Sequence, residues 1–162
     1  MEMKMRFDEL DGDQKRLVEE AEAVLKNAFD PYTKFFVGSA VLTSQGNIYR
    51  GVNVNTCAYG SICAERSAIC QAITNGEYSF RKIALMARSE GGVVNVPSGP
   101  CGICRQMIWE FSDLANEDIE IIMADSRKEY MIVTSIRELH PYGFGPRLCG
   151  GDYGMYLRRA RM

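Results

Sequence analysis

Apolar residues recur every three or four positions in three stretches of the chain, which is the spacing of one face of an α-helix. The first stretch covers residues 12–28, and Pro31 ends it. The second covers residues 62–73 and ends near Asn75-Gly76, and the third covers residues 101–111. The pattern therefore predicts three amphipathic helices.

Five other segments are rich in residues that favour β-strands, at residues 36–43, 48–54, 80–87, 119–124 and 130–134. The first two flank Ser44-Gln45-Gly46-Asn47, a turn sequence typical of a β-hairpin. The predicted order is helix, two strands, helix, strand, helix, two strands. Strands interleaved with helices in this way predict an α/β fold with one mixed five-stranded sheet covered by helices.

Length and composition favour a single domain over residues 1–162. The chain is 46% hydrophobic and 25% charged, and no apolar run approaches the roughly 18 residues of a membrane span. Its first 13 residues are charged and lack the apolar core of a secretory signal, so we expect a cytoplasmic protein without a membrane partner. A net charge of −2 argues against broad capture of nucleic acid. The basic C-terminus lies in an extra tail, residues 149–162, which we interpret as solvated.

Six cysteines and a single histidine, His140, limit the metal chemistry available to the chain. In a reducing compartment, clustered cysteines bind metal or act in redox reactions more often than they form disulfides. Cys101 and Cys104 lie one turn apart at the start of the third helix, and Cys63 begins the second. Helix N-termini favour the thiolate. If these two helix starts face each other, they supply three thiolates to one Zn²⁺ per chain and leave a fourth position open, as in catalytic zinc sites.

Two charged residues follow Cys63 closely enough to take part in such a site. Glu65 can lie beside the metal without binding it, where a carboxylate can take a proton from water and return it to a substrate. Zn²⁺ with three thiolates carries a formal charge of −1. The guanidinium of Arg66 could offset that excess and donate hydrogen bonds to sulfur.

A Cys-Ala-Glu segment at one helix start, with Pro-Cys-x-x-Cys at another, is the pattern of zinc-dependent deaminases. The sequence resembles the cytidine deaminase family in its small three-cysteine form, over about residues 32–148. The segments that match the family are Tyr32-Thr33-Lys34-Phe35-Phe36-Val37-Gly38-Ser39-Ala40, Gly51-Val52-Asn53-Val54-Asn55, Cys63-Ala64-Glu65-Arg66-Ser67-Ala68-Ile69, Pro100-Cys101-Gly102-Ile103-Cys104-Arg105-Gln106 and Leu139-His140-Pro141-Tyr142-Gly143-Phe144-Gly145-Pro146.

The resemblance implies a hydrolase that converts cytidine or deoxycytidine to the uracil nucleoside with release of ammonia, in pyrimidine salvage. It implies zinc binding by Cys63, Cys101 and Cys104, proton transfer by Glu65 and charge balance by Arg66. It also implies a homotetramer (or homodimer). Substrate contacts are implied for Asn53 and Asn55 at the ribose, Phe35 at the pyrimidine or sugar, the Ala64 backbone at the base, and Tyr59 and Phe144 in the pocket of a neighbouring subunit.

The sequence departs from the family pattern in two places. Asn55 stands where the family has a ribose-binding glutamate, and the segment between Asn53 and Cys63 is one residue shorter. A charged acceptor contributes about 1.5–3 kcal/mol to a hydrogen bond, against about 0.5–1.5 for a neutral one. Loss of the charge also relieves repulsion toward a sugar bearing a carboxylate or phosphate. We therefore expect intact deaminase chemistry with an altered sugar preference, and a blasticidin-S-type aminoacyl-nucleoside is the alternative substrate.

Three other functions are compatible with parts of the pattern. Cys101-Gly102-Ile103-Cys104 could form a redox C-x-x-C module, which leaves Cys63 and Glu65 without a role. A structural zinc held by four cysteines would need Cys57 as its fourth ligand, at a spacing unlike the usual short knuckle. A polynucleotide deaminase is disfavoured by the acidic charge balance.

Overall fold

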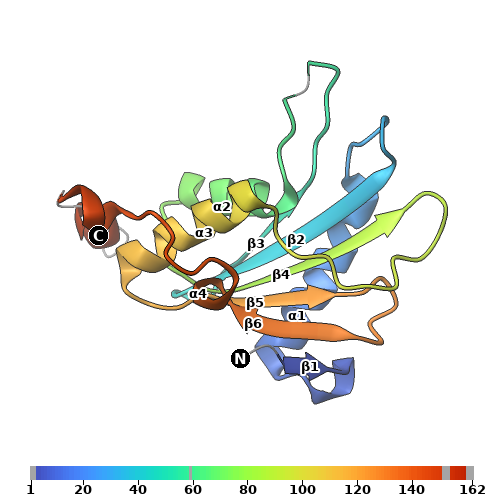
Figure 1. The fold of residues 1–162 in the computed structure, drawn as a ribbon, viewed down its shortest axis with the longest axis horizontal. Helices are drawn as coiled ribbons and strands as arrows, with labels where there is room; N and C mark the ends of the chain where they lie inside the picture. The colour runs from blue at the N-terminus through green and yellow to red at the C-terminus, as the bar shows by residue number, and fades with distance from the viewer. Residues whose placement is uncertain (1–2, 59, 151–153, 160–162) are drawn as a thin grey trace.

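One β-sheet forms the centre of the structure, and helices lie on both of its faces (Figure 1). The structure is a computed structural model that describes residues 3–58, 60–150 and 154–159. The predicted order of helices and strands is confirmed, and short elements are added at both ends of the chain. The architecture is therefore the expected α/β fold with a mixed sheet.

The sheet has six strands in the order β1-β6-β5-β4-β2-β3, and not the five that the sequence predicts. β4 and β5 run parallel, whereas the other neighbouring strands pair antiparallel. The additional strand is β1, which pairs with β6 at the edge of the sheet. The strand bounds are β1 Met3–Met5, β2 Phe35–Thr43, β3 Ile48–Val52, β4 Phe80–Ser89, β5 Glu120–Ala124 and β6 Met131–Ser135.

Helix ends differ from the prediction for local reasons. The second helix begins after Cys63 because that residue is an extended N-cap, and the third continues until Asn116, whose left-handed backbone (φ 56°) ends it. β3 ends at Val52, two residues before the predicted end, and Val54 instead forms isolated bridges to Phe29 and Ile62. The helical bounds are η1 Phe7–Glu9, α1 Gly12–Val24, η2 Leu25–Asn27, α2 Ala64–Thr74, α3 Gly102–Ala115, α4 Ile136–Leu139, η3 Pro146–Cys149 and α5 Gly154–Arg159. None of the helices in the described ranges is long and apolar enough to cross a membrane.

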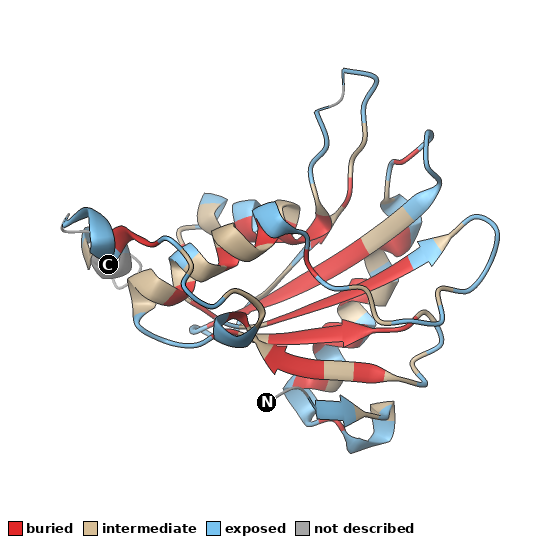
Figure 2. Cartoon of the chain, in the orientation of Figure 1, coloured by how far each residue is buried: buried red, intermediate tan, exposed pale blue. Residues whose placement is uncertain are grey.

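Alternation of side chains along the strands divides the core into two layers. Ala40, Leu42 and Ala84 point to the face covered by α1, whereas their neighbours Val41 and Ile83 point to the face covered by α2 and α3. The central strands are accordingly buried over most of their length (Figure 2). Burial of both faces makes the sheet a rigid base for the helix starts that carry the cysteines.

Two glycines allow the helices to approach the sheet at backbone distance. A Cβ atom on Gly51 of β3 would lie 2.3 Å from the Ala68 nitrogen and 2.4 Å from the Ala64 oxygen, both in α2. On the opposite face, a Cβ on Gly38 of β2 would lie 2.1 Å from the Ala21 oxygen of α1. The position of α2, and with it the first turn after Cys63, therefore depends on the absence of a side chain at Gly51.

Candidate active site

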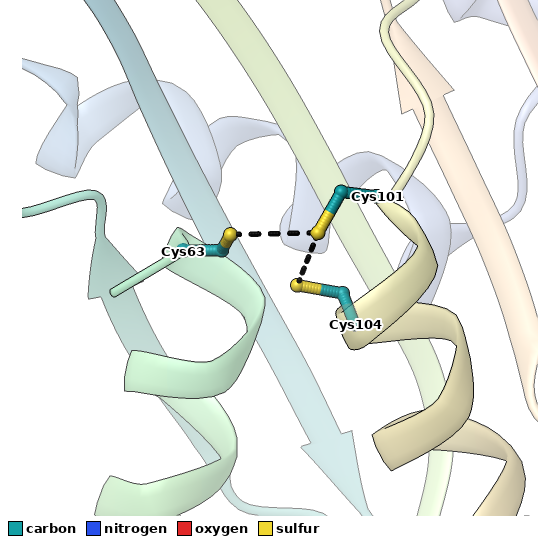
Figure 3. A group of neighbouring side chains, drawn as sticks. All are labelled: Cys63, Cys101 and Cys104. Atoms are coloured by element: carbon teal, nitrogen blue, oxygen red, sulfur yellow. Dashed lines mark hydrogen bonds between the residues drawn. The ribbon is translucent and has the colours of Figure 1, made fainter. Parts of the chain in front are cut away.

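The N-termini of α2 and α3 meet and bring three cysteines together (Figure 3). Cys63 caps α2, Cys101 caps α3, and Cys104 lies in the first turn of α3. The Sγ atoms of Cys63 and Cys101 are 3.6 Å apart, as are those of Cys101 and Cys104, and all three lie within 4.8 Å of one another. The thiols of Cys63 and Cys101 both point into the cluster (Figure 3).

The spacing of the three sulfur atoms suits a tetrahedral zinc ion. Zn–S bonds of about 2.3 Å in a tetrahedron place their sulfurs roughly 3.8 Å apart, close to the 3.6 Å observed for two of the three pairs. Burial raises the pKa of the Cys63 and Cys104 thiols, and the nearby Glu65 carboxylate raises both further. A cation held between the sulfurs stabilises the thiolates, so the residues present fit the metal that the sequence pattern predicts.

Glu65 lies in the first turn of α2 and is buried, with 4% of its surface exposed. It is not one of the three clustered ligand groups, but it borders the same cavity as Cys63 and Cys101. Burial raises the pKa of its carboxyl group, while contacts with Cys104 and Arg66 partly oppose that shift. A carboxyl group with a raised pKa beside a metal site is suited both to accept and to donate a proton.

Arg66 places a positive charge beside the three sulfurs. Its Nη2 donates a hydrogen bond to the Ser61 carbonyl at 2.7 Å, while its Nε is buried without a hydrogen-bond partner. Burial alone would lower the pKa of Arg66, but the three cysteines, Cys63 first among them, raise it. The guanidinium is therefore placed to balance the negative charge of a thiolate cluster.

A cavity of about 260 Å³ opens beside the cysteines. Five of the residues expected to contact substrate or move protons border it, and the structure adds several that the sequence analysis missed, chief among them Asp30. Phe144 does not border this cavity, and Tyr59 lies outside the described residues. The lining residues are Asp30, Thr33, Phe35, Val37, Asn53, Asn55, Ser61, Ile62, Cys63, Ala64, Glu65, Leu85, Ser98, Gly99 and Cys101.

Asn53 is nearly buried, and its side-chain amide links two backbone segments that line the cavity. Its Oδ1 accepts a hydrogen bond from the Val37 N–H at 2.8 Å, and its Nδ2 donates to the Phe35 carbonyl at 2.9 Å. The amide therefore joins the end of β3 to the start of β2 and fixes the backbone that carries Phe35. This role is compatible with ribose binding because Oδ1 has a second lone pair.

Asp30 was not singled out from the sequence. The only available signal was a local one, because an aspartate before Pro31 with Thr33 three positions on is typical of a turn. The structure shows that turn, in which the Thr33 N–H donates to Asp30 Oδ1 at 3.1 Å. A second cavity of about 500 Å³ adjoins the first through the shared residues Thr33, Asn55 and Ser61, and Cys57 lines this second cavity, apart from the cysteine cluster.

Comparisons with known proteins agree with this site. Residues 11–115 match the family described as "Cytidine and deoxycytidylate deaminase zinc-binding region". Cytidine deaminase from Sporosarcina psychrophila is 42% identical over 100 residues, covering 61% of this chain and 70% of that protein. Cytidine deaminase from Halalkalibacterium halodurans is 32% identical over 133 residues, covering 82% of this chain and 94% of that protein. The crystal structure of cytidine deaminase from Burkholderia pseudomallei superposes with a TM-score of 0.71 at 31% identity, covering 83% of this chain and 100% of that one.

The fold and the cysteine cluster define a zinc-dependent hydrolase of the deaminase class. The chain belongs to the cytidine and deoxycytidylate deaminase family. The redox interpretation fails to account for Cys63, whose sulfur lies as close to Cys101 as that of Cys104 does. The four-cysteine interpretation fails because Cys57 lies outside the cluster.

Proposed function

We propose that this protein hydrolyses the exocyclic amino group of cytidine or 2′-deoxycytidine, giving the uracil nucleoside and ammonia. One observation carries the proposal: three thiols lie at zinc-compatible spacing, and two of them, Cys63 and Cys101, border one small cavity together with a buried carboxyl group that is not a ligand. The cavity volume of about 260 Å³ lies just below the roughly 300–1,000 Å³ of sites for drug-sized ligands, which suits a single nucleoside. The relatives named above carry the name cytidine deaminase, which favours this substrate over an aminoacyl-nucleoside antibiotic.

The residues divide the work between metal binding, proton transfer and substrate positioning. Cys63, Cys101 and Cys104 would hold zinc, whose contribution when bound is to make water a stronger acid and hence a nucleophile near neutral pH. Arg66 would offset the charge of the thiolates. Ala64, whose backbone lies between Cys63 and Glu65, would contact the base.

Glu65 would carry the protons of the reaction. It accepts one from the attacking water and delivers it to N3 of the cytosine, which makes C4 more electrophilic. The oxygen of the attacking water then adds to C4, which gives a tetrahedral intermediate. Glu65 then takes the remaining proton from the C4 hydroxyl and passes it to the amino group, which leaves as ammonia while the C4–O bond becomes the uracil carbonyl.

Ammonia release from cytidine, deoxycytidine, cytosine and blasticidin S, with zinc quantified per chain, tests the substrate class. We expect turnover of the two nucleosides. Glu65→Gln should retain zinc and lower kcat by about 10²–10⁴-fold, the usual contribution of a positioned acid–base group. Glu19→Gln, on the exposed side of α1, is the matched control and should behave as the wild type. Turnover of Glu65→Gln close to the wild-type rate would reject the assigned role.

We further propose a cytoplasmic homotetramer in which Tyr59 and Phe144 complete the pocket of a neighbouring subunit. Free thiols on all six cysteines suit a reducing compartment. The loop between α4 and η3 supports the assembly, because its aromatic residues Tyr142 and Phe144 are 101% and 62% exposed. Sedimentation of the zinc-loaded protein measures the subunit number.

A further inference from the structure

Asp30 and Asn55 are neighbours across a short backbone pairing. The Phe29 N–H donates to the Asn53 carbonyl at 3.0 Å, and the Asn55 N–H donates to the Phe29 carbonyl at 2.7 Å. Phe29 and Val54 thereby form a parallel bridge, which brings Asp30 and Asn55 together although 25 positions separate them in the chain. Both residues border the cavity of about 260 Å³ that also contains Glu65.

Asp30 is a buried carboxylate, with 2% of its surface exposed. Its carboxylate accepts hydrogen bonds from the Thr33 N–H at 3.1 Å, the Thr33 hydroxyl, and the Phe35 N–H at 3.4 Å. Burial alone would raise the pKa of Asp30, but hydrogen bonds from Thr33, Asn55 and Phe35 lower it to about 2. Among the described residues that line the cavity there is no lysine or arginine, so no basic side chain at its wall neutralises this charge.

A carboxylate next to Asn55 also decides which way that amide faces. The carboxylate of Asp30 can only accept hydrogen bonds, so an Asn55 side chain paired with it must present the NH₂ group. The Asn55 carbonyl oxygen is then the atom left to accept a hydrogen bond from a ligand. Because a hydrogen bond to a charged group polarises the amide, that oxygen becomes a stronger acceptor.

We propose that Asp30 determines sugar specificity: it supplies the negative charge that Asn55 lacks, orients the Asn55 amide toward a sugar hydroxyl, and excludes cytosine compounds whose sugar carries an anionic group. This inference rests on the proposed nucleoside deamination and names the substrate class within it, a nucleoside with an uncharged sugar. It reverses the expectation drawn from Asn55 alone, that a carboxylate- or phosphate-bearing sugar would be better tolerated.

The alternative is that Asp30 merely closes the turn that ends at Thr33. A turn cap affects the binding of every substrate alike, whereas a charge discriminates between neutral and anionic sugars. The quantity that separates the two roles is therefore the ratio of kcat/KM for cytidine to that for cytidine 3′- or 5′-monophosphate, not the activity itself.

The experiment compares the wild type with Asp30→Asn, Thr33→Val and the charge-relocated pair Asp30→Asn/Asn55→Glu. Asp30→Asn should lower kcat/KM for cytidine by about 10-fold or more, mainly through KM, and should lower the nucleoside-to-nucleotide ratio by at least about 10-fold. The relocated pair should regain the ratio to within about threefold of the wild type. Thr33→Val keeps the charge of Asp30 and removes the hydroxyl that donates to it. It should therefore lower kcat/KM for cytidine and for the monophosphate by the same factor.

The outcomes are distinct. A folded Asp30→Asn variant whose ratio stays within about threefold of the wild type overturns the inference and leaves the deaminase function intact. A zinc-loaded wild type that releases no ammonia from any cytosine nucleoside overturns both. If Asp30→Asn does not fold, the Asn55→Ala variant is the deciding test. We expect its kcat/KM for cytidine to fall about 10-fold while it still excludes the nucleotides. An unchanged kcat/KM for cytidine contradicts the inference.

Discussion

Replacement of Gly51 by alanine tests how the sheet positions the metal site. The added Cβ would lie 2.4 Å from the Ala64 oxygen, and ordinary contacts begin at 3.4 Å. The neighbouring atoms belong to the backbone of α2, so no side-chain rotation can relieve the overlap. α2 must therefore move away from β3 by about 1 Å, the difference between these two distances, and it carries Cys63 and Glu65 with it.

Two quantities should change in Gly51→Ala. Overpacking of this kind costs about 1–3 kcal/mol of folding free energy, which lowers Tm by roughly 2–12 °C for a chain of this length. A displacement of about 1 Å at a catalytic group can cost about 100-fold in rate. We expect zinc affinity, measured by competition with a chelator, and kcat/KM for cytidine to fall beyond what the loss of stability explains.

Gly38→Ala is the matched control, because its Cβ would lie 2.1 Å from the Ala21 oxygen on the opposite face of the sheet. It should lose a comparable amount of stability while its zinc affinity and kcat/KM stay close to those of the wild type. The Cβ of Gly12→Ala would meet nothing within 4 Å, so this variant should leave stability, zinc affinity and kcat/KM unchanged. If Gly51→Ala and Gly38→Ala lose stability and zinc affinity in equal proportion, the proposed link between β3 and the metal site is wrong.

Two further predictions concern the cysteines and the buried carboxylate. Cys104→Ser should abolish stoichiometric zinc, as measured by atomic absorption, whereas Cys149→Ser, at an exposed position outside the cluster, should retain it. The pKa of Asp30 is lowered to about 2, below its value near 3.9 in an unfolded chain, so its stabilisation of at most about 2.6 kcal/mol is complete above about pH 5 and is lost as the pH falls toward 2. Urea unfolding should accordingly show the wild type and Asp30→Asn converging in stability below pH 4; a constant difference from pH 7 to pH 3 contradicts this assignment.

The order of the helices and strands was predictable because each main element carries its own periodic pattern. Residues 36–43 and 80–87 are strongly β-forming, and they became the two long central strands. β1 was missed because Met3-Lys4-Met5 is short and mostly exposed, and its only strand signal is pairing with β6, about 130 positions away. Pairing of this kind is a tertiary property that local propensity does not contain.

The cysteine cluster was also predictable, since its members lie at two helix starts with a recognisable spacing. Cys101 and Cys104 are one turn apart, and Cys63 and Glu65 share the beginning of another helix, so two local patterns needed only to meet. Asp30 offered no comparable signal. Its importance depends on the bridge between Phe29 and Val54, which no pattern within either segment predicts.

Asn55 shows how this difference affects a functional argument. Considered alone, an asparagine in place of a glutamate removes one negative charge from the sugar end of the site, and the expected consequence is tolerance of anionic sugars. The electrostatic field that a ligand experiences, however, is the sum of the contributions of every charge bordering the cavity. Backbone pairing places the buried carboxylate of Asp30 beside Asn55, so this end of the cavity carries a negative charge on another segment of the chain. The sign of the predicted preference therefore reverses, and the relocated-charge variant tests directly whether a charge at either position gives the same preference.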